Sequence, residues 1–480
     1  MSFYFNANNS INPTDALTRL IQIFKQSETS KLIKPVETQK NLVQMKISIF
    51  QDLKIKLNSL LTIVKDLSLS GTSSKFQVKT ADISNPSVLS IVAEPYATQS
   101  THAIFVQQLA KEDSVLSARF SNAGTEILTA VSEGTKTIRI IVNGVSTDVN
   151  VAVSSGDTNE MILNKIASNI NSTVSNVSAT VIRDTSSTSR LVIKSKNTGS
   201  QYAISLADVS GNLLESIGLG ASVISTRSSS TDVNGGYLYS DVNLLDAKII
   251  VNGVNITRGS NKINDVIPGL TIELKQAQNA GDTPVSVAVK IDSARVRESI
   301  DSFVKAYNDL IKFINDKTKT TPEGTRSTFS GDYMLTELKM NLRLKVSEMV
   351  SSGTLKFIND IGIKINSDGT LAISDATKLE KLISTDVSQV EALFNSSDGI
   401  AVKLKDFINP FVQIGGVVDQ RINFGKEQMK HIDERIKSLN SLIDQRAESL
   451  RKQFAQLLSL YNAFARQQAM VQQLTQAFVI

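Results

Sequence analysis

Side chains that could carry out chemistry are scarce in this sequence of 480 residues. It contains no cysteine and no tryptophan, and its only histidines are His102 and His431. The lack of cysteine excludes disulfides, thiol nucleophiles and thiolate metal sites. Two histidines leave little material for a metal centre or an acid–base relay.

Each histidine also has a structural interpretation, which we favour. His431 lies among Lys430, Asp433 and Glu434, a pattern typical of a solvated helix face. His102 directly precedes the apolar run Ala103 to Val106, which predicts a strand. The sequence therefore predicts no catalytic residue and no enzyme.

Two glycine-containing segments come closest to known ligand-binding loops. Gly218 and Gly220 resemble a fragment of a nucleotide-binding loop, but no third glycine or following acid supports it. Asn366 to Gly369 resembles part of a calcium loop, yet the ligand spacing and the terminal glutamate are missing. A hairpin turn is the better interpretation, so we expect no metal and no cofactor.

Composition indicates an ordinary multidomain protein with several apolar cores. The chain is 41% hydrophobic and 20% charged, and its net charge of +5 comes from 51 basic and 46 acidic residues. This charge is too balanced to indicate a binder of polyanions such as nucleic acid by itself. No apolar run approaches the ~20 residues of a membrane span. No secretory signal is visible, so we expect a cytoplasmic protein or one exported without a cleaved signal.

The first end of the chain predicts helices. A stripe starts after Asn12-Pro13, Ser27 to Pro35 interrupts it, and a heptad seam follows and stops at Gly71. The seam residues are Phe50, Leu53, Leu57, Leu60, Val64 and Leu67.

The other end predicts one long helix with a similar stripe. Residues Phe411 to Ile480 contain no proline, and the last acidic residue is Glu448. The stripe residues that we single out are Ile436, Leu439, Ile443, Leu450, Phe454, Leu457, Tyr461 and Phe464. A helix with so little charge in its last part is typical of one that packs against partners.

The middle of the chain, Thr72 to Ile291, alternates apolar and polar residues with period two and predicts strands. Asn143-Gly144 and Asn252-Gly253 each separate two strand patterns and predict hairpins with both turn residues at positive φ. Both turns lie in the same hexapeptide, IIVNGV, which suggests two domains built on one plan. One helix interrupts this region, with Asp157 and Glu160 resembling a capping box.

Helical periodicity returns after Ile291 and surrounds one small hairpin at Asp368-Gly369. Lys317 to Gly331 is a predicted loop, Asp375 a predicted helix cap, and Asn409-Pro410 a predicted break before the terminal helix.

We therefore predict an α+β multidomain fold, in which a discontinuous helical coiled coil or bundle from both chain ends carries two inserted β-rich domains. Thr226 to Gly236 is a predicted linker at the edge of the outer insertion. The predicted parts are a terminal leg (1–42, 425–480), an inner helical domain (43–72, 292–424), a β-rich domain (73–115, 237–291) and an outer β-rich domain (116–236).

Both seams admit two interpretations. The seam from Phe50 to Leu67 fits an ordinary intramolecular bundle as well as contacts between chains. For Ile443 to Phe464 we favour contacts between chains, because the stripe is long and the opposite face carries little charge.

The order of several motifs resembles the flagellar filament cap protein family, also called hook-associated protein 2. One such motif runs from Asn261 to Leu270, with Pro268-Gly269 near its end, and another runs from Gly362 to Leu371 before the long terminal helix. Thr137 to Gly199 is similar to the β-rich module of flagellar axial proteins. The resemblance covers nearly the whole chain, but Met1 to Asn12 lacks the glycine that often opens the family's first segment.

The resemblance implies a homo-oligomeric cap, a pentamer, at the distal tip of the growing bacterial flagellum. It also implies secretion through the flagellar channel, with flagellin and an export chaperone as partners. A hook–filament junction protein or a flagellin is an alternative, although the short first helical part and the long second one reverse the flagellin pattern. A surface adhesin that binds host glycans is the alternative from a different class.

Overall fold

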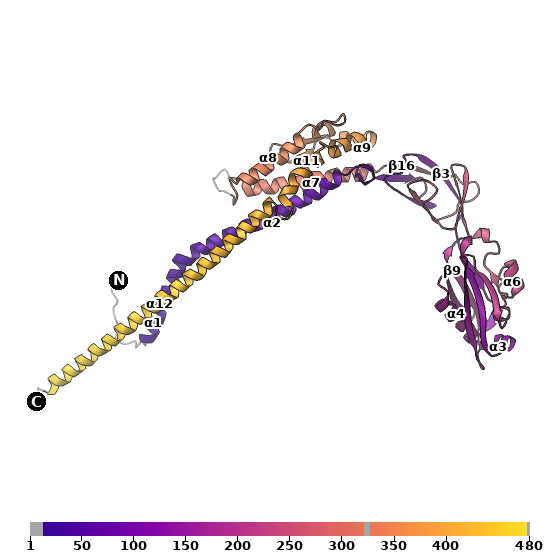
Figure 1. The fold of residues 1–480 in the computed structure, drawn as a ribbon, viewed down its shortest axis with the longest axis horizontal. Helices are drawn as coiled ribbons and strands as arrows, with labels where there is room; N and C mark the ends of the chain where they lie inside the picture. Colours follow the sequence, from indigo (N-terminus) through magenta and orange to yellow (C-terminus); the bar gives the residue numbers. More distant parts are fainter. Residues whose placement is uncertain (1–12, 321–326, 478–480) are drawn as a thin grey trace. The chain divides into compact units, whose positions relative to one another are not determined.

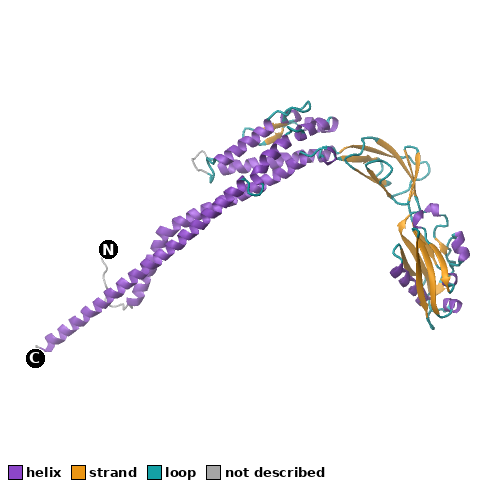
Figure 2. Cartoon of the chain, viewed as in Figure 1, coloured by secondary structure: helices purple, strands orange, loops and turns teal. Residues whose placement is uncertain are grey.

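The chain folds into two compact units in a computed structural model that describes residues 13–320 and 327–477. One unit combines both ends of the chain, residues 1–70 and 296–480, and the other comprises residues 71–295. We call them the helical unit and the β-rich unit. The predicted α+β fold, with helical chain ends and β-rich insertions, is confirmed (Figures 1 and 2). The division into four parts stays a prediction.

The helical unit contains eight helices and one small hairpin among the described residues. The helices are α1 (Pro13–Glu28), α2 (Lys34–Leu67), α7 (Ser293–Thr318), α8 (Tyr333–Ser347), α9 (Ala376–Thr385), α10 (Val387–Asn395), α11 (Ile400–Val412) and α12 (Val417–Ala477). The hairpin pairs β17 (Ile363–Ile365) with β18 (Leu371–Ile373), as the sequence predicts. A short 3₁₀ turn, Ile358–Ile361, precedes it.

Two caps in this unit arise from local sequence. Asp332 accepts a hydrogen bond from the backbone N–H of Leu335 and begins α8. Asp375 accepts one from Lys378 N–H and begins α9, as predicted. Each carboxylate satisfies an N–H that the first helical turn leaves without a partner.

Two predicted interruptions in the first helical part of the chain differ from the structure. Ser27 to Pro35 is not a break, because a π-helical turn, Thr29–Ile33, joins α1 to α2. Pro35 lies in the first turn of α2, directly after this π-helical turn. Gly71 does not end α2, which stops at Leu67 with Ser68 as its cap.

Pro410, at which the sequence predicts a break, also lies inside a helix. Pro410 belongs to the last turn of α11, and the break before α12 falls instead at residues 413–416. A proline removes one helical hydrogen bond and disfavours continuation of the helix, and α11 ends two residues later at Val412. Residues 1–12 and 321–326, on which a predicted tail and part of a predicted loop fall, lie outside the described residues.

The β-rich unit contains a pair of sheets that enclose one core. The first sheet has the order β1-β16-β3-β12-β13 and the second β14-β15-β2, with antiparallel neighbours. The strands are β1 (Lys79–Ile83), β2 (Leu89–Ala93), β3 (Thr101–Gln108), β12 (Ala247–Val251), β13 (Val254–Arg258), β14 (Lys262–Ile263), β15 (Leu270–Leu274) and β16 (Val285–Ile291). Alternate residues of β15 and β16 are buried, which confirms their predicted period of two.

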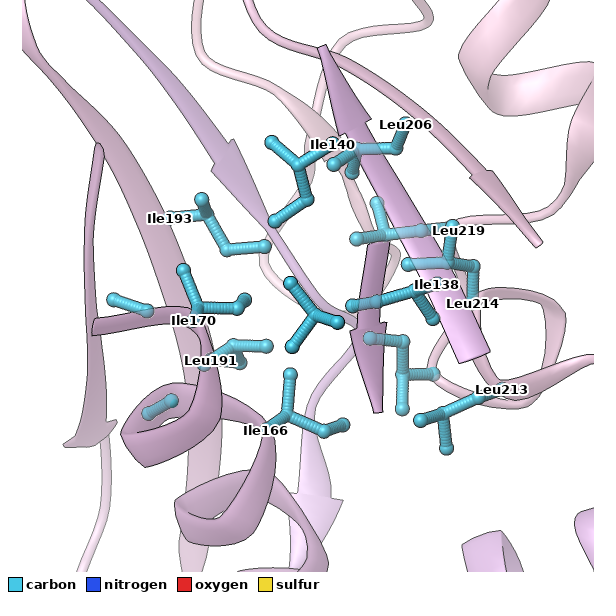
Figure 3. Packing of buried hydrophobic residues seen from close by; sticks show 14 of the residues in the cluster. Ile138, Ile140, Ile166, Ile170, Leu191, Ile193, Leu206, Leu213, Leu214 and Leu219 are labelled. Atoms are coloured by element: carbon cyan, nitrogen blue, oxygen red, sulfur yellow. The ribbon is translucent and has the colours of Figure 1, made fainter. Parts of the chain in front are cut away.

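The rest of the β-rich unit has its own core between two sheets and a helix. The sheets have the orders β10-β6-β7 and β11-β4-β9-β5, with β8 also paired to β9. The strands are β4 (Glu112–Leu116), β5 (Phe120–Ser121), β6 (Gly134–Val142), β7 (Val145–Val153), β8 (Val177–Arg183), β9 (Thr188–Thr198), β10 (Ser205–Ser210) and β11 (Gly236–Tyr237). The helices are α3 (Glu126–Val131), α4 (Asn159–Thr173), α5 (Leu213–Ser216) and α6 (Ala221–Thr226). Figure 3 shows Ile166 and Ile170 of α4 facing Leu191 and Ile193 of β9.

Local predictions in this region have mixed outcomes. Both Asn-Gly hairpins are confirmed, and Asn143 and Asn252 each have φ 51°. The predicted capping box of α4 is wrong, because Thr158 is the N-cap residue. Asp157 instead accepts a hydrogen bond from Ser154 N–H and pairs with Lys165.

The predicted linker, Thr226 to Gly236, is held in place by two arginines. Arg190 donates to the carbonyl oxygens of Thr231 and Asn234 at 2.7 and 2.9 Å. Arg227 places Nη2 2.8 Å from the buried carboxylate of Asp113. Composition alone could not identify these contacts. Arg190 binds backbone carbonyl groups, and the partner of Arg227, Asp113, is distant in the sequence.

Candidate interaction surface on the helical unit

The first predicted seam lies inside the helical unit. The side chains of Leu53, Leu57, Leu60 and Val64 have no exposed surface, Leu67 is 1% exposed and Phe50 is 6% exposed. Helix α2 packs against both α11 and α12. In this conformation the six seam residues fill the core of one chain and are not available to a second chain. This arrangement agrees with the intramolecular interpretation of the seam. A role for them in assembly stays a prediction.

Helices α2 and α12 run antiparallel along one another. Lys54 of α2 pairs with Asp419 of α12 at 2.5 Å, and Lys40 pairs with Asp433 at 2.6 Å. The hydrogen bond from Lys54 holds the pKa of Asp419 below its usual value. The α12 residue with the higher number pairs with the α2 residue with the lower number. The two helices therefore run in opposite directions.

Helix α1 continues this pair toward the chain ends. Its Lys25 lies 2.7 Å from Asp444, and Glu28 lies 2.9 Å from Arg446. The Lys25–Asp444 pair is exposed, so it contributes only about 0–1 kcal/mol, whereas Glu28 of the other pair is only 16% exposed. They do show that residues near both ends of the chain meet along α12.

The second predicted seam is divided into a covered and an uncovered part. Ile436 and Leu439 are half-buried against α2, and Ile443 is only 3% exposed. Leu450 is half-exposed and marks the change. Beyond it Leu457, Tyr461 and Phe464 are 63%, 70% and 66% exposed, and Phe454 is 40% exposed.

The uncovered part carries apolar side chains outside the predicted stripe as well. Leu458, Leu460, Met470 and Val471 are also exposed. The stripe spacing did not identify them, but the high apolar content of the last part of the sequence, on every helical face, could have done so. We call residues 450–471 of α12 the apolar extension.

The apolar extension has a simple charge pattern. Its charged residues are Arg451, Lys452 and Arg466, and no acidic residue occurs after Glu448. The apolar residues Leu457, Tyr461 and Phe464 stay exposed beside these three basic residues. The arrangement can bind an apolar partner surface, with a preference for acidic groups at its rim.

The described residues offer no alternative centre for chemistry. None of their His, Asp and Glu side chains form a group of three or more that could hold a metal ion. His431 makes only an exposed contact with Glu434 at 3.4 Å. His102 bridges Ser100 and Asn252 within the β-rich unit. No helix in the described ranges is long and apolar enough to cross a membrane.

Comparisons with known proteins agree on one family. The model described as "Flagellar hook-associated protein 2 C-terminus" matches residues 245–465, and that described as "Flagellar hook-associated protein 2 N-terminus" matches residues 16–113. The A-type flagellar hook-associated protein 2 of Pseudomonas aeruginosa is 28% identical over 419 residues, which cover 84% of this chain and 83% of that protein. The B-type protein of the same species is 26% identical over 470 residues, which cover 96% and 94%.

A solved structure shares the fold. The crystal structure of the D1, D2 and D3 domains of the flagellar cap protein FliD from Escherichia coli covers 78% of this chain and 99% of its own, with a TM-score of 0.61 and 22% identity. These names lend no support to the adhesin alternative. The N-terminal and the C-terminal family models match this chain in that order. The B-type relative also aligns along nearly its full length. The chain therefore belongs to the flagellar hook-associated protein 2 family, the family of the flagellar filament cap.

Proposed function

We propose that this protein is the structural cap at the distal end of the growing flagellum, where it helps flagellin to fold and to enter the filament. Family membership supports the flagellar role. The observation that carries the mechanism is the apolar extension, a helix that leaves the covered part of the helical unit with Leu457, Tyr461 and Phe464 exposed.

The helical unit combines a firm part and an open part. Residues up to Ala447 are held by the core of α2 and α11 and by the ion pairs of α1. Among the described residues, Leu457, Tyr461 and Phe464 of the apolar extension stay exposed. An isolated helix of this length is marginal in water. Partner contacts would therefore order it, with many modest contacts repeated over several subunits.

The proposed partners follow from this division. The apolar extension would contact flagellin or neighbouring subunits at the filament tip, and an export chaperone would cover it before secretion. The predicted stripe residues Leu450, Phe454, Leu457, Tyr461 and Phe464 would make these contacts. Ile436, Leu439 and Ile443 would hold the helix that carries them. We propose a homo-oligomer, and the family resemblance favours a pentamer.

Deletion of Ser449 to Ile480 tests the proposal. The deletion removes the apolar extension but none of the fully buried seam residues of α2. We expect complemented cells to secrete unpolymerised flagellin and to lack filaments, because the cap can no longer hold the tip. Circular dichroism of the purified variant should retain the strand signal of the β-rich unit.

A matched control separates binding from folding. Leu442→Ala removes a partly exposed side chain, 37% accessible, from the covered part of α12. This variant should leave filaments intact. Normal motility of the deletion strain would show that the apolar extension does not carry the function. Electron microscopy of the purified full-length protein would establish the number of subunits.

A further inference from the structure

Three asparagines in the described residues directly precede glycine: Asn143, Asn234 and Asn252. Glycine has no side chain to hinder its backbone nitrogen, so an Asn-Gly bond is prone to attack on the asparagine side-chain amide. We propose that Asn143 is a site of spontaneous deamidation, and that the fold protects Asn234 and Asn252.

The reaction needs only water as a second reactant. The backbone nitrogen of Gly144 forms a bond to the side-chain carbonyl carbon of Asn143, and the side-chain amide leaves as ammonia. The nitrogen proton is lost, and a cyclic imide results. Water then opens one of the two C–N bonds of the imide, giving aspartate or isoaspartate. No electron is gained or lost.

The chain contains its own control for local sequence. Asn143 and Asn252 lie in the same hexapeptide, IIVNGV, and both have φ 51° in a two-residue hairpin turn. Their intrinsic reactivity should therefore be alike. Any difference between them in the folded protein comes from tertiary contacts.

Asn252 is tied to the neighbouring strand β3. Its Oδ1 accepts a hydrogen bond from Ala103 N–H at 2.9 Å, and its own N–H donates to the Ala103 carbonyl at 2.9 Å. Its Nδ2 donates to Nδ1 of His102 at 3.1 Å. Strand β3 pairs with β12 as far as Val251 and continues past it, so its backbone reaches the turn. The side chain cannot rotate toward Gly253 until these bonds break.

Asn143 has no comparable neighbour. Strand β10 pairs with β6, and the pair nearest the turn is Ser205 with Ile141. The strand therefore does not reach Asn143. Within the described chain, no hydrogen bond holds the exposed Asn143 side chain. A Cβ placed on Gly144 or on Gly253 would meet nothing within 4 Å, so the two sites differ in the hydrogen bonds of their asparagines and not in the space around their glycines. The side chain and the peptide are therefore free to reach the reactive geometry.

Asn234 is protected through its glycine. Gly235 is buried, and a Cβ placed on it would lie 2.4 Å from the Gly218 carbonyl oxygen. The carbonyl of Asn234 accepts a hydrogen bond from Arg190, and its N–H donates to Thr231 Oγ1. The backbone at this turn is therefore fixed on both sides.

The test is peptide mapping of the full-length protein by mass spectrometry after incubation at mildly alkaline pH. We expect Asn143 to convert roughly 10- to 30-fold faster than Asn252, because Asn252 must first break two side-chain hydrogen bonds. Asn234 should also convert slowly. Both aspartate and isoaspartate products should appear at position 143.

Two further measurements identify the cause. In urea, where the fold is lost, Asn143 and Asn252 should convert at the same rate. In the folded His102→Ala variant, which removes one partner of Asn252, the rate at position 252 should rise several-fold while that at position 143 stays constant. Equal rates at 143 and 252 in the folded wild-type protein would overturn the proposal, and so would a faster rate at 252.

Discussion

Arg227 places its guanidinium nitrogen Nη2 2.8 Å from the carboxylate of Asp113, a residue without exposed surface and 114 positions away in the chain. The same guanidinium stacks over the ring of Tyr237, 3.9 Å from its centroid, and donates to the carbonyl of Tyr239. Asp113 also accepts from the backbone N–H of Ile204. This pair therefore connects β4, which contains Asp113, with the segment that follows α6.

Arg227→Ala should strongly destabilise the outer part of the β-rich unit. The substitution leaves the Asp113 carboxylate buried without its cation, which typically costs about 3–5 kcal/mol. Arg139→Ala is the matched control, because Arg139 pairs with Asp148 at the surface, and such pairs contribute about 0–1 kcal/mol. Hydrogen exchange of β4 and β9 peptides in urea measures both effects. Equal protection in the two variants would contradict the role of the buried pair.

Leu57→Ala and Leu457→Ala should have opposite effects on folding and function. Leu57 has no exposed surface, so its truncation should lower the stability of the helical unit by about 2–5 kcal/mol. Leu457 is 63% exposed, and its truncation should change stability by less than about 0.5 kcal/mol. Calorimetry of the purified proteins measures this difference.

The double variant Leu457→Ala with Phe464→Ala should shorten filaments in cells while the purified protein melts almost as the wild type does. The loss of contact appears only on assembly and repeats in each subunit of the cap. Filament length by microscopy and melting temperature form the pair of measurements. A large fall in melting temperature with normal filaments would mean that these side chains belong to an internal core.

Gly425→Ala should destabilise the α2–α12 pair despite the better helix propensity of alanine. A Cβ at residue 425 would lie 2.6 Å from Cγ1 of Ile47, close to the root of that side chain. The gain of about 0.5–1 kcal/mol from replacing a helical glycine is smaller than the 1–3 kcal/mol typical of overpacking. The second change Ile47→Ala should restore much of the lost stability. A double-mutant cycle by calorimetry tests this, and purely additive effects would exclude the steric explanation.

Asp398 should make the helical unit sensitive to acid. Hydrogen bonds from the hydroxyl and the N–H of Ser351, at 2.6 and 2.7 Å, lower the pKa of Asp398 to about 2. The folded pKa lies below the unfolded value of about 3.9, so the contribution is fully present above that value and is lost as pH falls to about 2.

The Asp398→Asn variant should therefore be less stable than wild type near neutral pH, and the difference should shrink between about pH 4 and 2. Asp406→Asn, at an exposed position of α11, is the control and should leave stability nearly unchanged. Urea unfolding at a series of pH values measures the difference. A difference that stays constant down to pH 2 would show that the Asp398 carboxylate is not the source.

Much of the local structure follows from residues a few positions apart. The Asn-Gly turns, the Asp375 cap and the three- and four-residue spacing of the α2 seam each depend on neighbours in sequence, so the sequence predicted them. The order of these elements also indicated the family. The predicted capping box at Asp157 was wrong, because the adjacent Thr158 competes for the same helical N–H groups.

Only the tertiary structure determined which parts of a pattern are covered. Ala447 and Leu457 belong to the same helical stripe, yet the first is 3% and the second 63% exposed. Spacing determines which face of a helix is apolar, but the length of the partner helix determines where burial ends. The same reason separates Asn143 from Asn252: identical hexapeptides form identical turns, and only the reach of a neighbouring strand makes them chemically different.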